Sequence, residues 1–135
     1  MPEAKATLVS HVFVYGTLRR GEHNDITKLR PRPRFVGVAR IAGTMYDLGA
    51  YPGVRLGGPS TVFGEVYEIS PELEAVLDEI EAVYPQERDE YVKRVIAVSA
   101  HERVLECILY EINLRFVRDK PVLPDGDWVR RKEGR

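Results

Sequence analysis

The sequence predicts an α+β fold, in which several β-strands accompany one well-defined helix. Short runs rich in β-branched and aromatic residues recur along the chain, and glycine and proline separate them. The apolar spacing changes clearly to a helical period after Ser70. At 135 residues, of which 44% are hydrophobic and 30% charged, the chain is large enough to bury a core within one domain.

Strands are predicted wherever β-branched and aromatic residues cluster. The first covers residues 8–15, where Val12, Phe13 and Val14 precede Tyr15 and the chain turns at Gly16. Further strands are expected over residues 35–41, 44–48, 61–69, 91–99 and 104–112. Residues 49–59 are rich in Gly and Pro, so we expect them to form a connection between strands.

The helix is predicted directly after the strand at 61–69. Ser70 can cap its first turn, and Pro71 suits its first position because proline needs no backbone donor there. Pro85 ends the helix, and residues 86–90 form a charged loop. The apolar residues at helical spacing are Leu73, Val76, Leu77 and Ile80.

We expect a single domain over residues 1–135, with an ordered core at about 8–115 and an irregular C-terminal tail. After Arg115 the periodic pattern weakens through Pro121, Pro124 and Gly126. Trp128 is the candidate for packing this tail back onto the body. No internal repeat or linker divides the chain.

The charge balance favours a small ligand over a polyanionic partner. Lys and Arg number 20 and Asp and Glu number 21, so no overall positive field attracts nucleic acid or anionic lipid. The lone Cys107 allows no intramolecular disulfide, and no run of residues could span a bilayer. We therefore expect a cytoplasmic protein with no nucleic-acid or membrane partner; the sequence predicts no particular oligomeric state.

A glycine loop follows the first strand, with the sequence Tyr15-Gly16-Thr17-Leu18-Arg19-Arg20-Gly21. Gly16 can adopt a positive φ, which would leave successive backbone amides pointing the same way as a nest for a carboxylate or phosphate. The alternative is an ordinary turn. The loop lacks the ending of a P-loop and the spacing of a dinucleotide fingerprint. Arg19, Arg20 and Arg30 lie nearby in sequence and could assist an anion.

A carboxylate near the end of the predicted helix is the second candidate. Glu81 flanks the apolar stripe, and both the negative helix C-terminus and the neighbouring Ile80 and Val83 would raise its pKa. A raised pKa suits a general base. Glu74 shares this flank, and an ordinary surface role for Glu81 is the alternative. His11, His23 and His101 are too widely separated to predict a metal site, so we expect each to be structural or exposed.

Several motifs occur in an order that resembles the γ-glutamylcyclotransferase-like superfamily, particularly its short bacterial, γ-glutamylamine-acting branch. The resemblance covers nearly the whole chain. Its opening signature is the run over residues 12–21, VFVYGTLRRG. The later motifs are Tyr51-Pro52-Gly53, Gly64-Glu65-Val66-Tyr67, Leu77-Asp78-Glu79-Ile80-Glu81, Tyr91 before an apolar strand, and Gly126-Asp127-Trp128.

The resemblance implies a fold and a site. The fold is a small mixed β-barrel flanked by short helices, with a cavity at one end. The glycine loop, here Tyr15, Gly16, Thr17 and Leu18, would bind the α-carboxylate of a γ-glutamyl group through backbone amides. Glu81 would be the general base, and Tyr91 matches an aromatic residue near the site. No metal or organic cofactor is implied.

The implied reaction is a lyase-type, cyclising acyl transfer that converts a small γ-glutamyl amine or amino-acid conjugate to 5-oxoproline and a free amine. The alternative is a non-catalytic binding module that keeps the carboxylate-binding cavity. Two departures from the family concern the substrate. Residues 82–90 look longer and more charged than in the animal enzymes, and Thr-Leu-Arg follows Gly16 where glutathione-route enzymes tend to have Ser-Asn. We expect residues 49–59 and 83–90 to surround the leaving amine.

Overall fold

A five-stranded mixed sheet forms the body of the protein. The computed structural model describes residues 10–80 and 90–133, and in it the strand order is β2-β3-β1-β5-β4. The parallel pair is β1 with β5, and the other neighbours run antiparallel. The strands are β1 (Ser10–Val14), β2 (Arg34–Asp47), β3 (Pro52–Ile69), β4 (Tyr91–Ala100) and β5 (Arg103–Ile112). The helical elements are η1 (Ile26–Lys28), α2 (Pro71–Ile80), η2 (Leu114–Phe116) and α3 (Trp128–Glu133).

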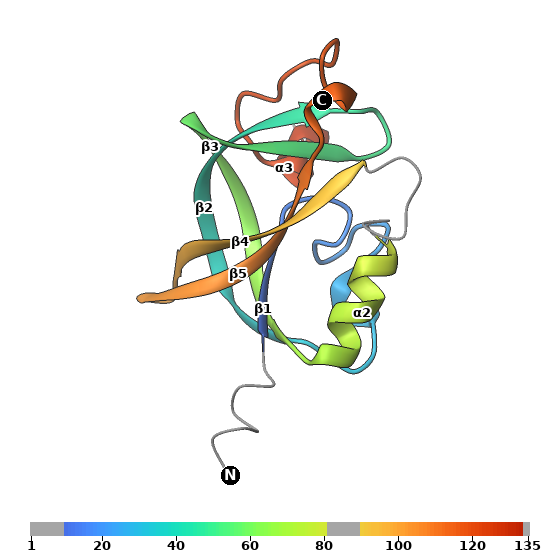
Figure 1. The fold of residues 1–135 in the computed structure, drawn as a ribbon, viewed down its shortest axis with the longest axis vertical. Coiled ribbons are helices and arrows are strands. Elements are labelled where there is room, and N and C mark those ends of the chain that lie inside the picture. Colours follow the sequence, from blue (N-terminus) through green and yellow to red (C-terminus); the bar gives the residue numbers. More distant parts are fainter. Residues whose placement is uncertain (1–9, 81–89, 134–135) are drawn as a thin grey trace.

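The predicted α+β class is confirmed, and the structure corrects the expectation of a barrel. The sheet curls strongly, so that the β4–β5 hairpin crosses in front of β1 and β3 in Figure 1. The two outer strands, β2 and β4, come into contact, but within the described residues they sit at opposite ends of the hydrogen-bonded strand order. The sheet is therefore a curled, open one.

Strand β3 is much longer than predicted. The connection expected at 49–59 is wrong for most of its length, because β3 begins at Pro52 and pairs there with Asp47 of β2. A tight turn at Gly49, with φ of 100°, is enough to reverse the chain. Gly57 and Gly58, both at positive φ, lie where the β2–β3 register shifts. The glycines that suggested a loop thus form a bulge inside a hairpin.

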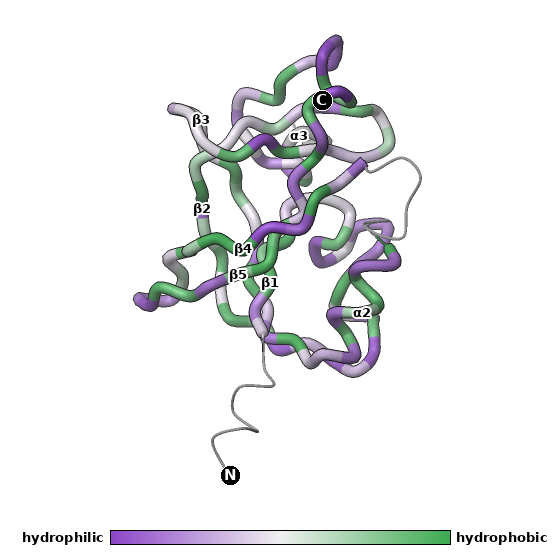
Figure 2. Tube along the Cα trace, in the orientation of Figure 1, coloured by the Kyte–Doolittle hydropathy of each residue, from purple (hydrophilic) through white to green (hydrophobic). Residues whose placement is uncertain are grey.

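Strand β1 is buried on both of its faces, which explains its nearly continuous apolar sequence. Phe13 and the following Tyr15 belong to a core cluster inside the curled sheet, together with Trp128. Val12 and Val14 belong to a second cluster that includes Leu73 and Leu77 of α2. Figure 2 shows the hydrophobic course of β1 and β5, in contrast to the hydrophilic turn between β4 and β5. Burial on two sides requires a strand without polar alternation.

Helix α2 begins as predicted and buries one residue that the apolar pattern did not indicate. The Ser70 hydroxyl oxygen accepts a hydrogen bond from the Leu73 amide at 3.2 Å, which is an N-cap. Asp78 is also buried, because it accepts from the Tyr110 hydroxyl at 2.7 Å and from Lys93 Nζ at 3.0 Å. Residues 81–89, and with them the predicted helix end, lie outside the described residues.

The residues after 115 pack against β2 and β3. Val122 forms a bridge with Tyr46, and the Phe63 amide donates to the Gly126 carbonyl at 2.7 Å. Trp128 is 2% exposed, so the expectation that it packs the tail onto the body is confirmed. This segment therefore shares the first core cluster with β1.

Candidate functional site

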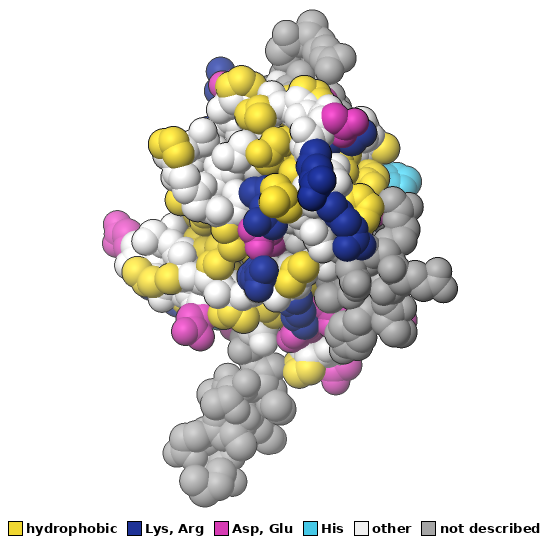
Figure 3. All heavy atoms as spheres, turned by 45° about the horizontal axis from the view of Figure 1, so that its top comes forward, with side chains coloured by type: hydrophobic (Ala, Val, Ile, Leu, Met, Phe, Trp, Pro, Cys, Tyr) yellow, Lys and Arg dark blue, Asp and Glu magenta, His cyan; other side chains and the backbone are white. Residues whose placement is uncertain are grey.

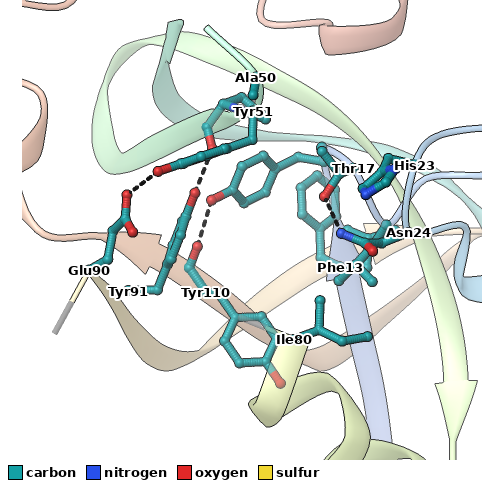
Figure 4. Close-up of a pocket in the computed structure, with 15 residues that line it drawn as sticks. Phe13, Thr17, His23, Asn24, Ala50, Tyr51, Ile80, Glu90, Tyr91 and Tyr110 are labelled. Carbon is teal, nitrogen blue, oxygen red and sulfur yellow. Dashed lines mark hydrogen bonds between the residues drawn. The ribbon is translucent and has the colours of Figure 1, made fainter. Parts of the chain in front are cut away.

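A cavity of about 260 Å³ opens where β1 ends. Its walls come from segments far apart in sequence: the glycine loop, the turn before β3, the end of α2, and the adjoining parts of β4 and β5. Figure 4 shows tyrosine rings crossing the cavity, with Thr17 and Asn24 on one side and Glu90 on the other. The lining residues include all of the predicted substrate-binding residues, Tyr15, Gly16, Thr17, Leu18 and Tyr91.

Residues 16–18 of the glycine loop line the cavity, and their backbone carbonyls and amides differ in whether they have partners. The carbonyls of Gly16, Thr17 and Leu18 accept hydrogen bonds from Arg19, Asn24 and Ile26 in turn, at 3.0, 2.8 and 2.9 Å. The amides of the same three residues donate to no acceptor among the described residues. Gly16 and Leu18 are buried. Buried amides without protein partners are available to a ligand oxygen.

Gly16 is required for a different reason from the predicted one. The expected positive φ at Gly16 is wrong, since the positive-φ glycine of this loop is Gly21, with φ of 85°. A Cβ placed on Gly16 would lie 2.6 Å from Cγ of Pro52 and 2.8 Å from its Cδ. Glycine is therefore needed because the start of β3 packs directly against the loop.

Three tyrosine hydroxyls hold the cavity walls together. Tyr15 donates to the Tyr110 carbonyl at 2.6 Å, and Tyr91 donates to the Pro52 carbonyl at 2.8 Å. Tyr51 donates to Oε2 of Glu90 at 2.5 Å. These bonds tie the glycine loop to β5 and the start of β4 to the start of β3 (Figure 4). The Tyr91 hydroxyl thus has a structural partner in this arrangement.

Two carboxylates bear on the predicted chemistry. Glu81, the predicted base, lies outside the described residues, but Ile80, its neighbour in the chain, lines the cavity. Glu90 also lines the cavity. The sequence placed it in the charged loop expected near the leaving amine, but did not single it out as a site residue. Its position directly before Tyr91, a residue matched to the site, is the signal that could have identified it.

The arginines near the glycine loop are absent from the cavity lining, so the expectation that they assist an anion is not met among the described residues. Arg19 is buried, with Nε 3.0 Å from Glu65 Oε2 and Nη1 2.8 Å from Asp127 Oδ1. Burial would raise the pKa of the Asp127 carboxyl, but hydrogen bonds from Arg19 and the Arg130 amide outweigh it and lower that pKa. Arg30 is exposed and donates to the Leu29 carbonyl.

Comparison with known proteins identifies the family. The family model described as gamma-glutamyl cyclotransferase, AIG2-like, matches residues 12–130. A Vibrio cholerae protein that is provisionally named a gamma-glutamylcyclotransferase is 36% identical over 128 residues, covering 89% of this chain and 96% of the relative. The gamma-L-glutamyl-butirosin B gamma-glutamyl cyclotransferase of Niallia circulans is 40% identical over 75 residues, covering 55% of this chain and 47% of that protein.

Solved structures share the fold. An AIG2-like protein from Mus musculus superposes with a TM-score of 0.71 at 23% identity, covering 86% of each chain. An uncharacterised protein from Pyrococcus horikoshii superposes with a TM-score of 0.67 at 24% identity, covering 93% of this chain and 96% of the other. Because the family model matches most of the chain and the Vibrio cholerae relative is 36% identical, the chain belongs to the gamma-glutamyl cyclotransferase, AIG2-like family. It is an enzyme of the gamma-glutamylcyclotransferase type.

Other classes of site find no support in the part of the chain that the structure describes. Residues 10–80 and 90–133 contain no group of three or more His, Cys, Asp or Glu arranged to hold a metal ion. None of the helices in these ranges is long and apolar enough to cross a membrane. On the face seen in Figure 3, Lys and Arg side chains are interspersed with apolar and acidic ones.

Proposed function

We propose that this protein releases 5-oxoproline from a small γ-glutamyl amine or amino-acid conjugate, with Glu81 as the general base. The observation that carries the proposal is that Gly16, Thr17 and Leu18 all line a small cavity, while their backbone amides donate to no described residue. Such donors suit the α-carboxylate of a γ-glutamyl group, because backbone amides bind anions without needing a charged side chain.

The chemistry needs a base beside the amine that attacks. In the proposed step, Glu81 removes a proton from the α-ammonium group. The freed amine attacks the γ-carbonyl carbon to form the ring C–N bond. The ring nitrogen then loses its second proton, and the bond to the leaving amine breaks. The leaving nitrogen takes up both of the protons that the α-ammonium has lost and departs as an ammonium group. Attack within one molecule gains mainly from orientation, which here means holding the freed amine beside the γ-carbonyl carbon.

The cavity supports a small substrate and favours one of the two candidate classes. Its volume of about 260 Å³ lies just below the range of about 300–1,000 Å³ that is usual for ligand pockets. Glu90 is the only Asp, Glu, Lys or Arg among the described residues that line it. A carboxylate on the leaving amine would be repelled by Glu90, whereas an ammonium group would be attracted. We therefore favour a γ-glutamyl amine over an amino-acid conjugate.

The test is direct measurement of 5-oxoproline release from matched substrates. The wild-type protein is incubated with γ-glutamyl-ethylamine, with γ-glutamyl-1,2-diaminoethane and with γ-glutamyl-alanine. Glu81→Gln and Glu90→Gln are measured beside it, because each removes one carboxylate and keeps the size of the side chain. We expect Glu81→Gln to abolish product formation with all substrates, and Glu90→Gln to relieve the discrimination against γ-glutamyl-alanine.

Each part of the proposal has its own contrary result. Full turnover by Glu81→Gln would show that another group is the base, and loss of all turnover in Glu90→Gln alone would assign that role to Glu90. Tight binding of the substrates without product would leave only the binding module. If the wild-type protein acts faster on γ-glutamyl-alanine than on the two γ-glutamyl amines, amino-acid conjugates would be the favoured substrate class instead.

A further inference from the structure

Glu65 is a buried carboxylate that lies behind the glycine loop. It is 8% exposed and is not among the residues that line the cavity. Its Oε2 accepts from Arg19 Nε at 3.0 Å, and its Oε1 accepts from the Arg20 amide at 3.1 Å and from the Tyr67 hydroxyl at 2.9 Å. Two of these three donors belong to the loop. A buried carboxylate with this many partners is fixed in place.

The same residue also marks where the loop begins. Val14, the last residue of β1, pairs with Glu65 in the β1–β3 ladder. The chain leaves the sheet at that point, passes through residues 15–18, and returns to the Glu65 side chain through Arg19 and Arg20. Glu65 therefore contacts both ends of the cavity-lining part of the loop: its backbone pairs with Val14 before it, and its side chain bonds Arg19 and Arg20 after it.

The donors of the loop divide into two groups. The amide of Arg19 donates to Gly16 O, that of Arg20 to Glu65 and that of Gly21 to Asp25 Oδ2 at 2.8 Å. These bonds satisfy the second half of the loop within the protein. The amides of residues 16–18 are left without an acceptor among the described residues.

We propose that Glu65 is a positioning residue for substrate binding: by closing the loop at Arg19 and Arg20, it holds the amides of residues 16–18 where they bind the substrate carboxylate. This inference rests on the proposed function. Glu65 acts through the loop and does not touch the substrate, so its effect is on binding. The amides bind the carboxylate alike before and during ring closure, so their displacement raises KM and leaves kcat nearly unchanged.

Arg19 extends this support to the C-terminal segment. Its Nη1 bonds Asp127 Oδ1 at 2.8 Å, and the same oxygen accepts from the Arg130 amide at 3.0 Å. Asp127 therefore caps α3 while it holds Arg19, and Trp128 beside it is buried in the first core cluster. The glycine loop is thus anchored to the sheet through Glu65 and to the tail through Asp127.

Glu65→Gln tests the proposal, with Glu111→Gln as the matched control. The variant keeps the side-chain size, but loses the charge and turns an amide N–H₂ or an uncharged oxygen toward Arg19. Glu111 on β5 is equally buried, at 6% exposed, and also accepts from an arginine and a backbone amide: Arg94 Nε at 2.9 Å and the Leu56 amide at 2.9 Å. It has no hydrogen bond to the loop among the described residues and does not line the cavity.

We expect Glu65→Gln to raise KM for γ-glutamyl-ethylamine about tenfold with kcat within about twofold of wild type. Glu111→Gln should lose about as much thermal stability as Glu65→Gln but leave KM unchanged. A merely structural role for Glu65 would lower the folded fraction, which reduces apparent kcat and leaves KM unchanged. Equal KM values for the two variants would overturn the proposal.

Binding of 5-oxoproline, followed by titration calorimetry, separates this proposal from the proposed function. Suppose that the wild-type protein binds 5-oxoproline but turns over no substrate, and that Glu65→Gln binds 5-oxoproline about tenfold more weakly. This result would support the positioning role of Glu65 and reject the proposed reaction. If the wild-type protein turns over substrate but Glu65→Gln binds 5-oxoproline with unchanged affinity, the reaction would be supported and the positioning role of Glu65 rejected. If Glu65→Gln does not fold, Arg19→Lys provides the same test, because lysine keeps the charge but cannot bond two carboxylates with one planar fork.

Discussion

Replacing Gly16 by alanine tests the contact between the glycine loop and the start of β3. The added methyl group would lie 2.6 Å from Cγ of Pro52, whereas ordinary contacts begin near 3.4 Å, so the two segments must separate by 3.4 − 2.6 = 0.8 Å. A proline ring cannot rotate out of the way, and the Pro52 carbonyl is held by the Tyr91 hydroxyl. The separation must therefore come from the backbone of the loop.

We expect two effects of this displacement. Overpacking of a buried contact lowers the free energy of unfolding by about 1–3 kcal/mol. Because a shift near 1 Å in a positioning group can reduce a rate about 10²-fold, kcat/KM for 5-oxoproline release should fall by about that factor. Unfolding in urea and the progress of 5-oxoproline formation measure the two effects on one preparation.

Two further variants show whether the contact itself is responsible. Gly37→Ala is the matched control, since its Cβ would lie 3.7 Å from the nearest atom, and we expect stability within about 0.5 kcal/mol of wild type. In Gly16→Ala/Pro52→Ala the clashing ring atoms are gone, so the double variant should lose less stability than the sum of the single ones by about 0.5–3 kcal/mol. Additive losses, or full activity in Gly16→Ala, would refute the argument.

Three other outcomes follow from described contacts. Burial raises the pKa of the Cys107 thiol to about 11, so Ellman's reagent at pH 8 should label the unfolded protein and not the native one; rapid native labelling would contradict the burial. Tyr91→Phe leaves the buried Pro52 carbonyl without its 2.8 Å donor and should lower the melting temperature by about 4–8 °C, whereas an unchanged melting curve would show that the bond is dispensable. Burial lowers the pKa of Lys93, but hydrogen bonds to the two α2 carboxylates outweigh it and raise that pKa. The stabilisation of about 0.5–1 kcal/mol that is lost in Lys93→Met should therefore be complete below about pH 10.5 and should disappear as the pH rises through the raised value. Urea unfolding of both proteins at pH 7 and at a series of pH values above 10.5 tests this, because a stability difference that is the same at every pH would be independent of the Lys93 charge.

The sequence predicted the parts of this fold that depend on neighbouring residues. The cap at Ser70, the turn of the chain at Gly16 and the burial of Trp128 follow from local patterns or side-chain type, and all three are present, although Gly16 does not adopt a positive φ. The first part of the long strand β3 was predicted as a connection because glycine and proline usually mark loops, whereas here Gly57 and Gly58 form a bulge. Local composition alone does not distinguish these two uses of glycine.

The support of the site depends on residues distant in sequence, and one sequence does not indicate such pairs. Arg19 was associated with a ligand anion because it follows Gly16, but its partners are Glu65 and Asp127, which lie 46 and 108 positions away. Asp78 falls off the apolar stripe and is nevertheless buried, because Tyr110 from β5 reaches it. Glu90 was predicted to lie in a charged loop near the leaving amine, but nothing in the loop's composition distinguished it from its charged neighbours. The family resemblance supplied the positions of the site, and the structure supplied their partners.

The hydrogen bond between Arg19 and Asp127 affects the order in which parts of the protein can fold during synthesis. Bonds of great sequence separation form late in folding, because the intervening chain must lose its freedom first. During synthesis Arg19 leaves the ribosome early, yet its second carboxylate arrives 108 positions later. The Tyr15 hydroxyl likewise waits for the Tyr110 carbonyl, 95 positions on. Once residue 65 has emerged, a nascent chain can therefore hold the glycine loop to the sheet, but the anchor to the C-terminal segment forms only when Asp127 follows.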